Sequence, residues 1–352
     1  MTETIRLATR GSDLALRQAQ QVAATLENRR QEVEIVEVET EGDAVRDELI
    51  HRLGKTGAFV RSLDEKVLDG EVDAAVHSMK DMPTEFPNEL VVAGVPERAA
   101  AGDLLVTPDG TRLEALPRGA TVGTSSLRRK AQLLATRPDL EVRPLRGNVD
   151  TRVQKLLAPS LQREHEARVE ASEDGENTQY RQSPDEWFDS LSELERQALE
   201  ADVETDYDGI VLAEAGLARI ELLDAVEYSR LPKSFVSAPG QGALAITARS
   251  GDTAEMLRGA LDHPRTRVET TVERTILGTL GGGCVAPIGI YAVLQGEYVQ
   301  TRVRVLSQDG TEEIKSARDI PAETHPKAAR QFAEDLAADG AAELIERARR
   351  EE

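Results

Sequence analysis

Hydrophobic and polar positions in the N-terminal third alternate with the periods of strands and helices. Four runs predict strands, at 5–9, 33–38, 72–76 and 90–95. Ser12 is suited to cap a helix over 13–30, because its hydroxyl can accept a bond from an unpaired amide of the first turn. A second helix is predicted over 59–68. This rhythm predicts an open, largely parallel sheet, whose ligands bind beyond the carboxyl ends of the strands.

The rhythm resumes near Asp103 and changes near Pro264. Further strands are predicted at 121–123, 142–145 and 210–213, with helices ending near Arg137 and Leu157. After Pro264 come a helix, a glycine-rich loop, three strand-like runs and a long amphipathic helix over 325–350. We therefore predict two α/β domains and a smaller α+β domain, with bounds at 1–98 joined by 238–262, at 99–237, and at 263–352.

The second α/β unit is interrupted over 159–206 by an acidic insertion. It holds 15 acidic and 4 basic residues, about half of the net charge of −21, together with the single tryptophan, Trp187. Residues 190–200 have helical spacing. We interpret the insertion as solvated surface. A flexible lid or a partner-docking arm is the alternative.

Composition narrows the class of protein. A net charge of −21 argues against nucleic-acid binding, which needs basic surfaces. The sequence contains no apolar run long enough to span a membrane and begins without a signal-peptide stretch. A single cysteine excludes a disulfide framework and fits a reducing compartment. We expect a cytoplasmic protein, and its many acids and few lysines are typical of a halophilic organism.

Charged residues follow the strand over 72–76 directly. Lys80 offers a cation for a carboxylate, and Asp81 beside it offers a group for acid–base catalysis. Pro83 disfavours helix at the residue before it, so the segment is expected to be a shaped loop. The alternative is an adjacent surface ion pair, which would contribute little to stability.

Residues 123–129 have the form of an anion cradle. Hydroxyls of Thr124, Ser125 and Ser126 stand where a helix begins, and unpaired amides there attract negative charge. Arg128 and Arg129 in the first turn oppose the helix dipole, so an anion would explain them better than chance. The alternative is a capped helix followed by two exposed arginines.

Arginine recurs at other strand ends. Arg146 and Arg152 flank the start of one helix, and Arg10 with Ser12 follows the first strand. Because a guanidinium binds carboxylates through paired hydrogen bonds, the implied ligand carries several carboxylates or phosphates. The turn at 240–242 is interpreted as a hinge or close backbone contact, since no phosphate-binding G-K-[ST] follows it.

The single cysteine, Cys284, lies in a glycine-rich run over 280–287, where something bulky can approach. It is either a buried, inert thiol or a point of covalent attachment. The five histidines have no metal-ligand spacing, so no metal is expected. A Ser-His-Asp triad around His77 stays open, although the sequence has no G-x-S-x-G motif.

Six stretches, in order, resemble the porphobilinogen deaminase family, also called hydroxymethylbilane synthases. They are ATRGS (8–12), HSMKD (77–81), GTSSLRR (123–129), LRGN (145–148), PGQG (239–242), and ER (273–274) through GGC (282–284). The resemblance covers nearly the whole chain apart from the insertion. It implies two lobes like those of type II periplasmic binding proteins, with the active site between them.

The resemblance also implies the chemistry. Cys284 would hold a dipyrromethane cofactor through a thioether, and four porphobilinogen units would be joined head to tail with release of ammonia. Hydrolysis would then free the linear hydroxymethylbilane. Asp81 would be the acid–base residue. The residues implied to hold the acetate and propionate groups are Arg10, Ser12, Lys80, Thr124, Ser125, Ser126, Arg128, Arg129, Arg146 and Arg152, with Lys55, Gln241 and Arg219 as further candidates. The family also implies a monomer.

Two positions depart from the family pattern. The family commonly has Gly-Gly-Lys-Gly before the helix over 59–68, whereas the run over 54–57 shifts the lysine to Lys55 and places Thr56 in its position. Ala286 stands where a larger β-branched residue is usual, which would alter loop packing.

Three other functions compete with the deaminase reading. A solute-binding protein would explain the arginines but not Cys284. A different transferase would use Cys284 as a transient nucleophile, which needs a nearby cation or base. An inactive, cofactor-free relative would be expected to have lost Asp81 or Cys284.

Overall fold

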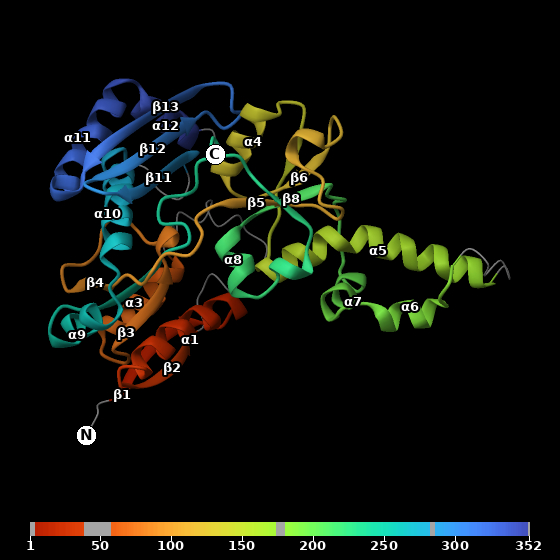
Figure 1. Ribbon diagram of the computed structural model, residues 1–352, viewed down its shortest axis with the longest axis horizontal. Helices are drawn as coiled ribbons and strands as arrows, with labels where there is room; N and C mark the ends of the chain where they lie inside the picture. The colour runs from red at the N-terminus through yellow and green to blue at the C-terminus, as the bar shows by residue number, and fades with distance from the viewer. Residues whose placement is uncertain (1–3, 39–57, 174–179, 282–285, 351–352) are drawn as a thin grey trace.

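The computed structural model describes residues 4–38, 58–173, 180–281 and 286–350. In this part of the chain, three sheets organise the molecule, two of five strands and one of three. Figure 1 shows them as three bodies, with a helical arm extending from the middle of the chain. The two larger sheets form what we call the first and second lobes, and the smaller sheet forms the third region.

The first lobe has the strand order β2-β1-β3-β10-β4. Its strands are β1 (Thr4–Arg10), β2 (Glu32–Val38), β3 (Ala74–Ser78), β4 (Leu90–Gly94) and β10 (Leu244–Arg249). β1 runs parallel to β2 and β3, whereas β10 is antiparallel to both of its neighbours. Helices α1 (Asp13–Glu27) and α9 (Asp252–Leu261) pack on one face, and α3 (Ala58–Leu68) packs on the other. The predicted largely parallel sheet is confirmed.

The second lobe repeats this plan, with the order β7-β6-β8-β5-β9. Its strands are β5 (Asp103–Val106), β6 (Thr121–Gly123), β7 (Glu141–Arg143), β8 (Gly209–Ala213) and β9 (Tyr228–Arg230). β5 is the antiparallel strand here. Helix α4 (Leu127–Thr136) covers one face, and α5 (Val149–Glu173) with α8 (Glu214–Arg219) covers the other.

Two segments of the chain, which we call the first and second crossovers, join the lobes. The first leads from β4 to β5 and the second from β9 to β10, so the antiparallel strand of each sheet is the one that follows a crossover. Sequence reasoning predicted none of β5, β9 and β10 as strands. The crossovers place 95–102 and 231–243 side by side, where the amide of Ala99 bonds to the carbonyl of Gly242 at 3.2 Å.

The third region has the predicted α+β form. Helix α10 (Pro264–Thr279) packs on the antiparallel strands β11 (Ile288–Gln295), β12 (Tyr298–Leu306) and β13 (Glu313–Pro321). The single helix predicted over 325–350 is wrong, because the structure has α11 (His325–Ala338) and α12 (Ala341–Arg350). Gly340, with φ of 99°, breaks the helix between them.

The insertion is a folded arm. Helix α5 continues through Pro159 to Glu173, so its predicted end near Leu157 is wrong. It packs with α6 (Pro184–Ser190) and α7 (Glu193–Leu199), which lies within the helix expected over 190–200. Trp187 is only 6% exposed and stacks on His165 at 6.0 Å between ring centroids. The insertion therefore has a small core of its own, and packing against the other two helices offsets the cost of Pro159.

Candidate functional site

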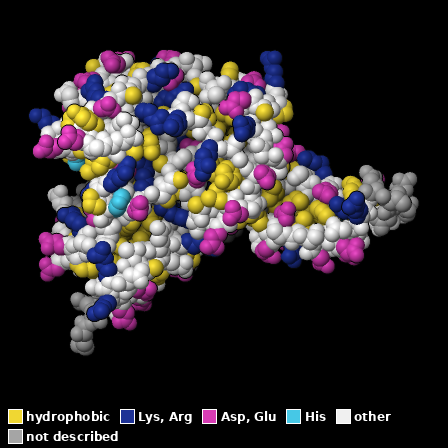
Figure 2. Space-filling model, viewed as in Figure 1, with side chains coloured by type: hydrophobic (Ala, Val, Ile, Leu, Met, Phe, Trp, Pro, Cys, Tyr) yellow, Lys and Arg dark blue, Asp and Glu magenta, His cyan; other side chains and the backbone are white. Residues whose placement is uncertain are grey.

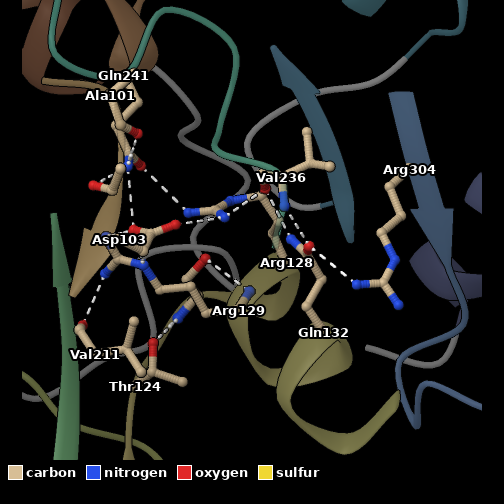
Figure 3. A network of polar contacts seen from close by, with 12 residues as sticks. Ala101, Asp103, Thr124, Arg128, Arg129, Gln132, Val211, Val236, Gln241 and Arg304 are labelled. Atoms are coloured by element: carbon tan, nitrogen blue, oxygen red, sulfur yellow. Dashed lines mark hydrogen bonds and ion pairs between the residues drawn. The ribbon is translucent and has the colours of Figure 1, made fainter. Parts of the chain in front are cut away.

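A buried carboxylate lies where the chain from the first lobe enters the second lobe. Asp103 begins β5, and its side chain has no exposed surface. Arg128 Nη1 donates to Asp103 Oδ2 at 2.8 Å, and Arg129 Nη2 donates to Oδ1 at 2.7 Å (Figure 3). Both arginines stand in the first turn of α4 and are 4% and 6% exposed, so the alternative of two exposed arginines is wrong.

The charges in this cluster do not cancel. Burial by itself would raise the pKa of Asp103, but Arg128 and Arg129 outweigh it and lower the pKa to about 2. Burial lowers the pKa of Arg128, although Asp103 acts in the opposite direction. Two guanidinium groups thus share one carboxylate and retain an excess positive charge.

A third arginine adds to that excess. Arg152, in the first turns of α5, donates from Nε to the carbonyl of Gly147 at 2.8 Å. Burial and the nearby charge of Arg129 lower the pKa of Arg152 to about 10. No carboxylate in the described part of the chain forms an ion pair with Arg152. Arg146 lies beside it, with its carbonyl accepting from Lys155 at 3.3 Å.

Two guanidinium nitrogens in the same area lack partners. Nε of Arg128 and Nε of Arg219 are both buried, and neither forms a hydrogen bond within the described residues. Arg219 ends α8 and donates from Nη2 to the carbonyl of Gly242 at 2.8 Å, and burial lowers its pKa. Because unpaired buried donors are costly, this arrangement fits an anionic ligand that accepts from them.

The predicted hydroxyl cradle forms at the start of α4, but its hydroxyls bond to the backbone. Ser126 caps the helix by accepting from the amide of Arg129 at 3.4 Å. Thr124 Oγ1 accepts from the amide of Ser126 at 3.2 Å. Ser125 Oγ donates to the carbonyl of Leu145 at 2.6 Å and accepts from its amide at 3.1 Å. These three side chains therefore shape the loop that carries the arginines.

The other predicted residues lie at one edge of the first lobe. Strands β1 and β3 are parallel neighbours, so Arg10 at the end of β1 and the turn after β3 share the carboxyl edge. Asp81 ends that turn, a 3-10 helix η1 (Met79–Asp81), and both Lys80 and Asp81 are exposed. Ser12 caps α1 by accepting from the amide of Ala15 at 3.3 Å.

The turn at 240–242 holds the crossovers together, as the predicted close backbone contact. Gln241 donates from Nε2 to the carbonyl of Ala101 at 2.7 Å and accepts from Arg128 Nη2 at 3.2 Å. Gly242 has φ of 85°, and a Cβ there would lie 2.5 Å from the carbonyl oxygen of Ala99. The site arginines and the joint between the lobes are therefore one network.

The triad reading of His77 is wrong. Its Nε2 lies 3.0 Å from Oδ1 of Asp64 and 3.1 Å from Oγ1 of Thr247. A triad needs one ring nitrogen on the acid and the other on the nucleophile, whereas a single nitrogen meets both groups here. Within the described residues, no group of three or more potential metal ligands lies together. In that same part of the chain, no helix is long and apolar enough to cross a membrane.

Sequence reasoning missed the partners of the arginines. The sequence does offer a signal for Asp103, because this acid stands directly before the apolar run Leu104 to Val106. Gln132 binds the second crossover through two hydrogen bonds. Its Nε2 donates to the carbonyl of Val236 at 2.8 Å, and its Oε1 accepts from the amide of Val236 at 2.7 Å. Arg98 and Glu273 form a buried pair at 2.8 Å that joins the first crossover to α10.

Two predicted residues, Lys55 and Cys284, lie outside the described residues. Ala286, the other departure from the family pattern, is buried in the core of the third region. Figure 2 shows Lys and Arg side chains gathered over the middle of the face it presents.

Comparisons with known proteins show the family of this chain. The family model described as "Porphobilinogen deaminase, dipyromethane cofactor binding domain" matches residues 5–171 and 193–257, and the model of the family's C-terminal domain matches 268–344. A Halobacterium salinarum protein named "Probable porphobilinogen deaminase" is 53% identical over 99% of both chains. A Campylobacter hominis protein named "Porphobilinogen deaminase" is 34% identical over 98% of both. The chain belongs to the porphobilinogen deaminase family.

Proposed function

We propose that this chain joins four porphobilinogen molecules head to tail, releasing ammonia at each step, and then hydrolyses off the linear hydroxymethylbilane. The observation that carries the proposal is the arginine cluster around Asp103, with its excess charge and two buried unpaired donors. Each porphobilinogen brings two carboxylates, so a growing chain of them needs many guanidinium partners.

The second lobe supplies most of the proposed carboxylate-binding groups. Arg128 and Arg129 keep positive charge beyond what Asp103 neutralises, and Arg152 stands next to them. Buried guanidinium groups bind carboxylates more strongly than exposed ones, because little water competes. We assign Arg146 and Arg152, with Arg10 and Ser12 on the first lobe, to the substrate.

Asp81 is the proposed acid and base. It stands exposed in the turn after β3, at an edge that also holds Arg10 and Lys80. As an acid it would protonate the departing amine of porphobilinogen, so that ammonia leaves. As a carboxylate it would stabilise the positive charge that develops on the pyrrole, a preorganised electrostatic effect.

The residues present fit a dipyrromethane cofactor, because its acetate and propionate groups could accept from the unpaired Nε of Arg128. We propose that Cys284 holds it through a thioether, with Lys80, Arg128, Arg129 and Arg146 around its carboxylates. When bound, the cofactor supplies the pyrrole carbon to which the first substrate is joined. We also propose that the protein acts as a cytoplasmic monomer.

Replacing Asp81 tests this proposal. We expect Asp81→Asn to lower the rate of ammonia release by about 10²-fold or more, the usual contribution of a general acid. Glu85→Gln, at another exposed acid in the same loop, is the matched control and should keep the wild-type rate. Near-normal turnover in Asp81→Asn would remove Asp81 from the mechanism. Tight porphobilinogen binding without any ammonia release by the wild type would favour a solute-binding protein.

A further inference from the structure

Arg274 in α10 reaches from the third region to the turn that carries Asp81. Its Nη1 donates to the carbonyl of Met82 at 3.3 Å, and its Nη2 donates to the carbonyl of Pro83. Its guanidinium also lies 5.6 Å from the ring centroid of Phe86. The two carbonyls belong to the residues that follow Asp81 directly, so Arg274 holds the downstream side of the turn.

The second crossover, over 231–243, holds the upstream side of the same turn. The amide of Met79 donates to the carbonyl of Ala243 at 3.0 Å. Met79 also packs so closely on Gly240 that a Cβ there would lie 2.6 Å from its Cγ. Glu273 in turn accepts from the amide of Gly240 at 2.6 Å. Consecutive residues of α10, Glu273 and Arg274, therefore support the two sides of the turn.

The contact between α10 and this turn is not a close-packed apolar interface. A cavity of about 390 Å³ lies between them, lined by Met79, Thr84, Val92, Thr270, Arg274 and Arg330 among others. Apolar side chains of α10 such as Val272 and Ile276 instead face the core of the third region. The position of the turn relative to α10 thus depends on directed hydrogen bonds more than on packing.

We propose that Arg274 is a positioning residue for Asp81. By binding two successive carbonyls it fixes the turn that aims the Asp81 carboxylate, and this inference rests on the proposed role of Asp81. An arginine suits the task because its planar fork can donate to both carbonyls at once, which a lysine ammonium does less well. α10 ends at Thr279, five positions before Cys284 in the sequence, so one helix would support the acid and lead to the proposed attachment residue.

A purely structural role is the competing explanation, and Arg267 provides its control. Arg267 lies two helical turns earlier in α10, and its Nη2 donates to the carbonyls of Val92 and Ala93 at 3.2 and 3.3 Å. It bridges α10 to the same lobe, but through carbonyls of β4 and not of the Asp81 turn, and it also pairs with Asp262 at 2.6 Å. Arg267→Gln therefore removes a comparable bridge without touching the turn.

The test compares Arg274→Gln, Arg274→Lys and Arg267→Gln for turnover of porphobilinogen. Because misplacing a catalytic group by about 1 Å can cost about 10²-fold, we expect Arg274→Gln to lower kcat by about tenfold or more, with KM nearly unchanged. Arg274→Lys should recover part of the loss, and Arg267→Gln should keep the wild-type kcat. Urea unfolding of all three variants shows whether a loss comes from unfolding.

A double variant separates positioning from general damage. If Arg274 acts through Asp81, adding Arg274→Gln to Asp81→Asn should cause no further loss of the residual single-turnover rate. Additive losses, or equal losses in Arg267→Gln and Arg274→Gln, would overturn the inference. Failure of the proposed function would look different, because the wild type would then release no ammonia, or Asp81→Asn would turn over normally.

Discussion

Asp103→Asn should destabilise the protein, because Asp103 is a buried charge paired with two arginines. The change keeps the shape of the side chain but removes the charge that Arg128 and Arg129 share. Since a tenfold change in acidity is worth about 1.4 kcal/mol, lowering the pKa from 3.8 to about 2 stabilises the folded state by roughly 2–3 kcal/mol. Removing one partner of a buried ion pair costs about 3–5 kcal/mol, so we expect a loss in that range at neutral pH.

The pH dependence follows from the same pKa. Above about pH 5, Asp103 is ionised in the folded and unfolded states alike, and its contribution is fully present. As the pH falls from about 5 toward 2, the unfolded carboxyl takes up a proton while the folded one stays ionised, so the contribution is progressively lost. Asp103→Asn should therefore unfold at lower urea at neutral pH, and its stability should fall less steeply below about pH 5.

Asp139→Asn is the control for this reasoning. The pKa of Asp139 is also lowered to about 2, chiefly by its hydrogen bond to Arg137, but this pair is partly exposed, with 24% of the Asp139 side chain accessible against none of the Asp103 side chain. Water screens such a pair, so its removal should change the urea midpoint little. Urea unfolding at constant salt, from about pH 3 to neutral, measures both variants. Equal, small losses in the two would refute the argument that burial makes Asp103 important.

Two further predictions concern the joint between the lobes and the arm. Gly242→Ala should destabilise the protein by about 2 kcal/mol or more in urea unfolding, because it adds a clash with the carbonyl of Ala99 to the strain of positive φ. Gly119→Ala, at φ of 79° with open space around it, should cost only the strain, and equal effects would contradict the clash. Trp187, the single tryptophan, reports on the arm, which packs mainly on itself. Its fluorescence should shift at lower urea than the circular dichroism of the whole chain, and coincident transitions would show that the arm unfolds with the lobes.

Sequence periodicity predicted the features that depend on local pattern. Apolar runs such as 72–76 and the cap at Ser12 led to strands and helices that the structure contains, with β3 starting two residues later. The helix predicted to end near Leu157 continues through Pro159 to Glu173, because α5 packs against α6 and α7, and local sequence spacing does not report that packing. The amphipathic pattern over 325–350 suggested a single helix, although Gly340 within it marks the break between α11 and α12.

The candidate site could be predicted only in part for the same reason. The two arginines of α4 did indicate an anion, but the first anion they meet is Asp103, 25 residues earlier in the sequence. Only the fold brings that carboxylate to them and leaves Nε of Arg128 unpaired. The contact of Arg274 with the carbonyl of Met82, 192 residues away, was equally beyond local spacing.

The intact mass of the purified protein tests whether Cys284 carries the cofactor. We expect the mass to exceed that of the chain by two porphobilinogen units less two ammonia molecules, and peptide mapping should locate this excess on the peptide that contains Cys284. Cys284→Ser should lack this excess and the turnover that depends on it. An active protein with an unmodified Cys284 would contradict the account.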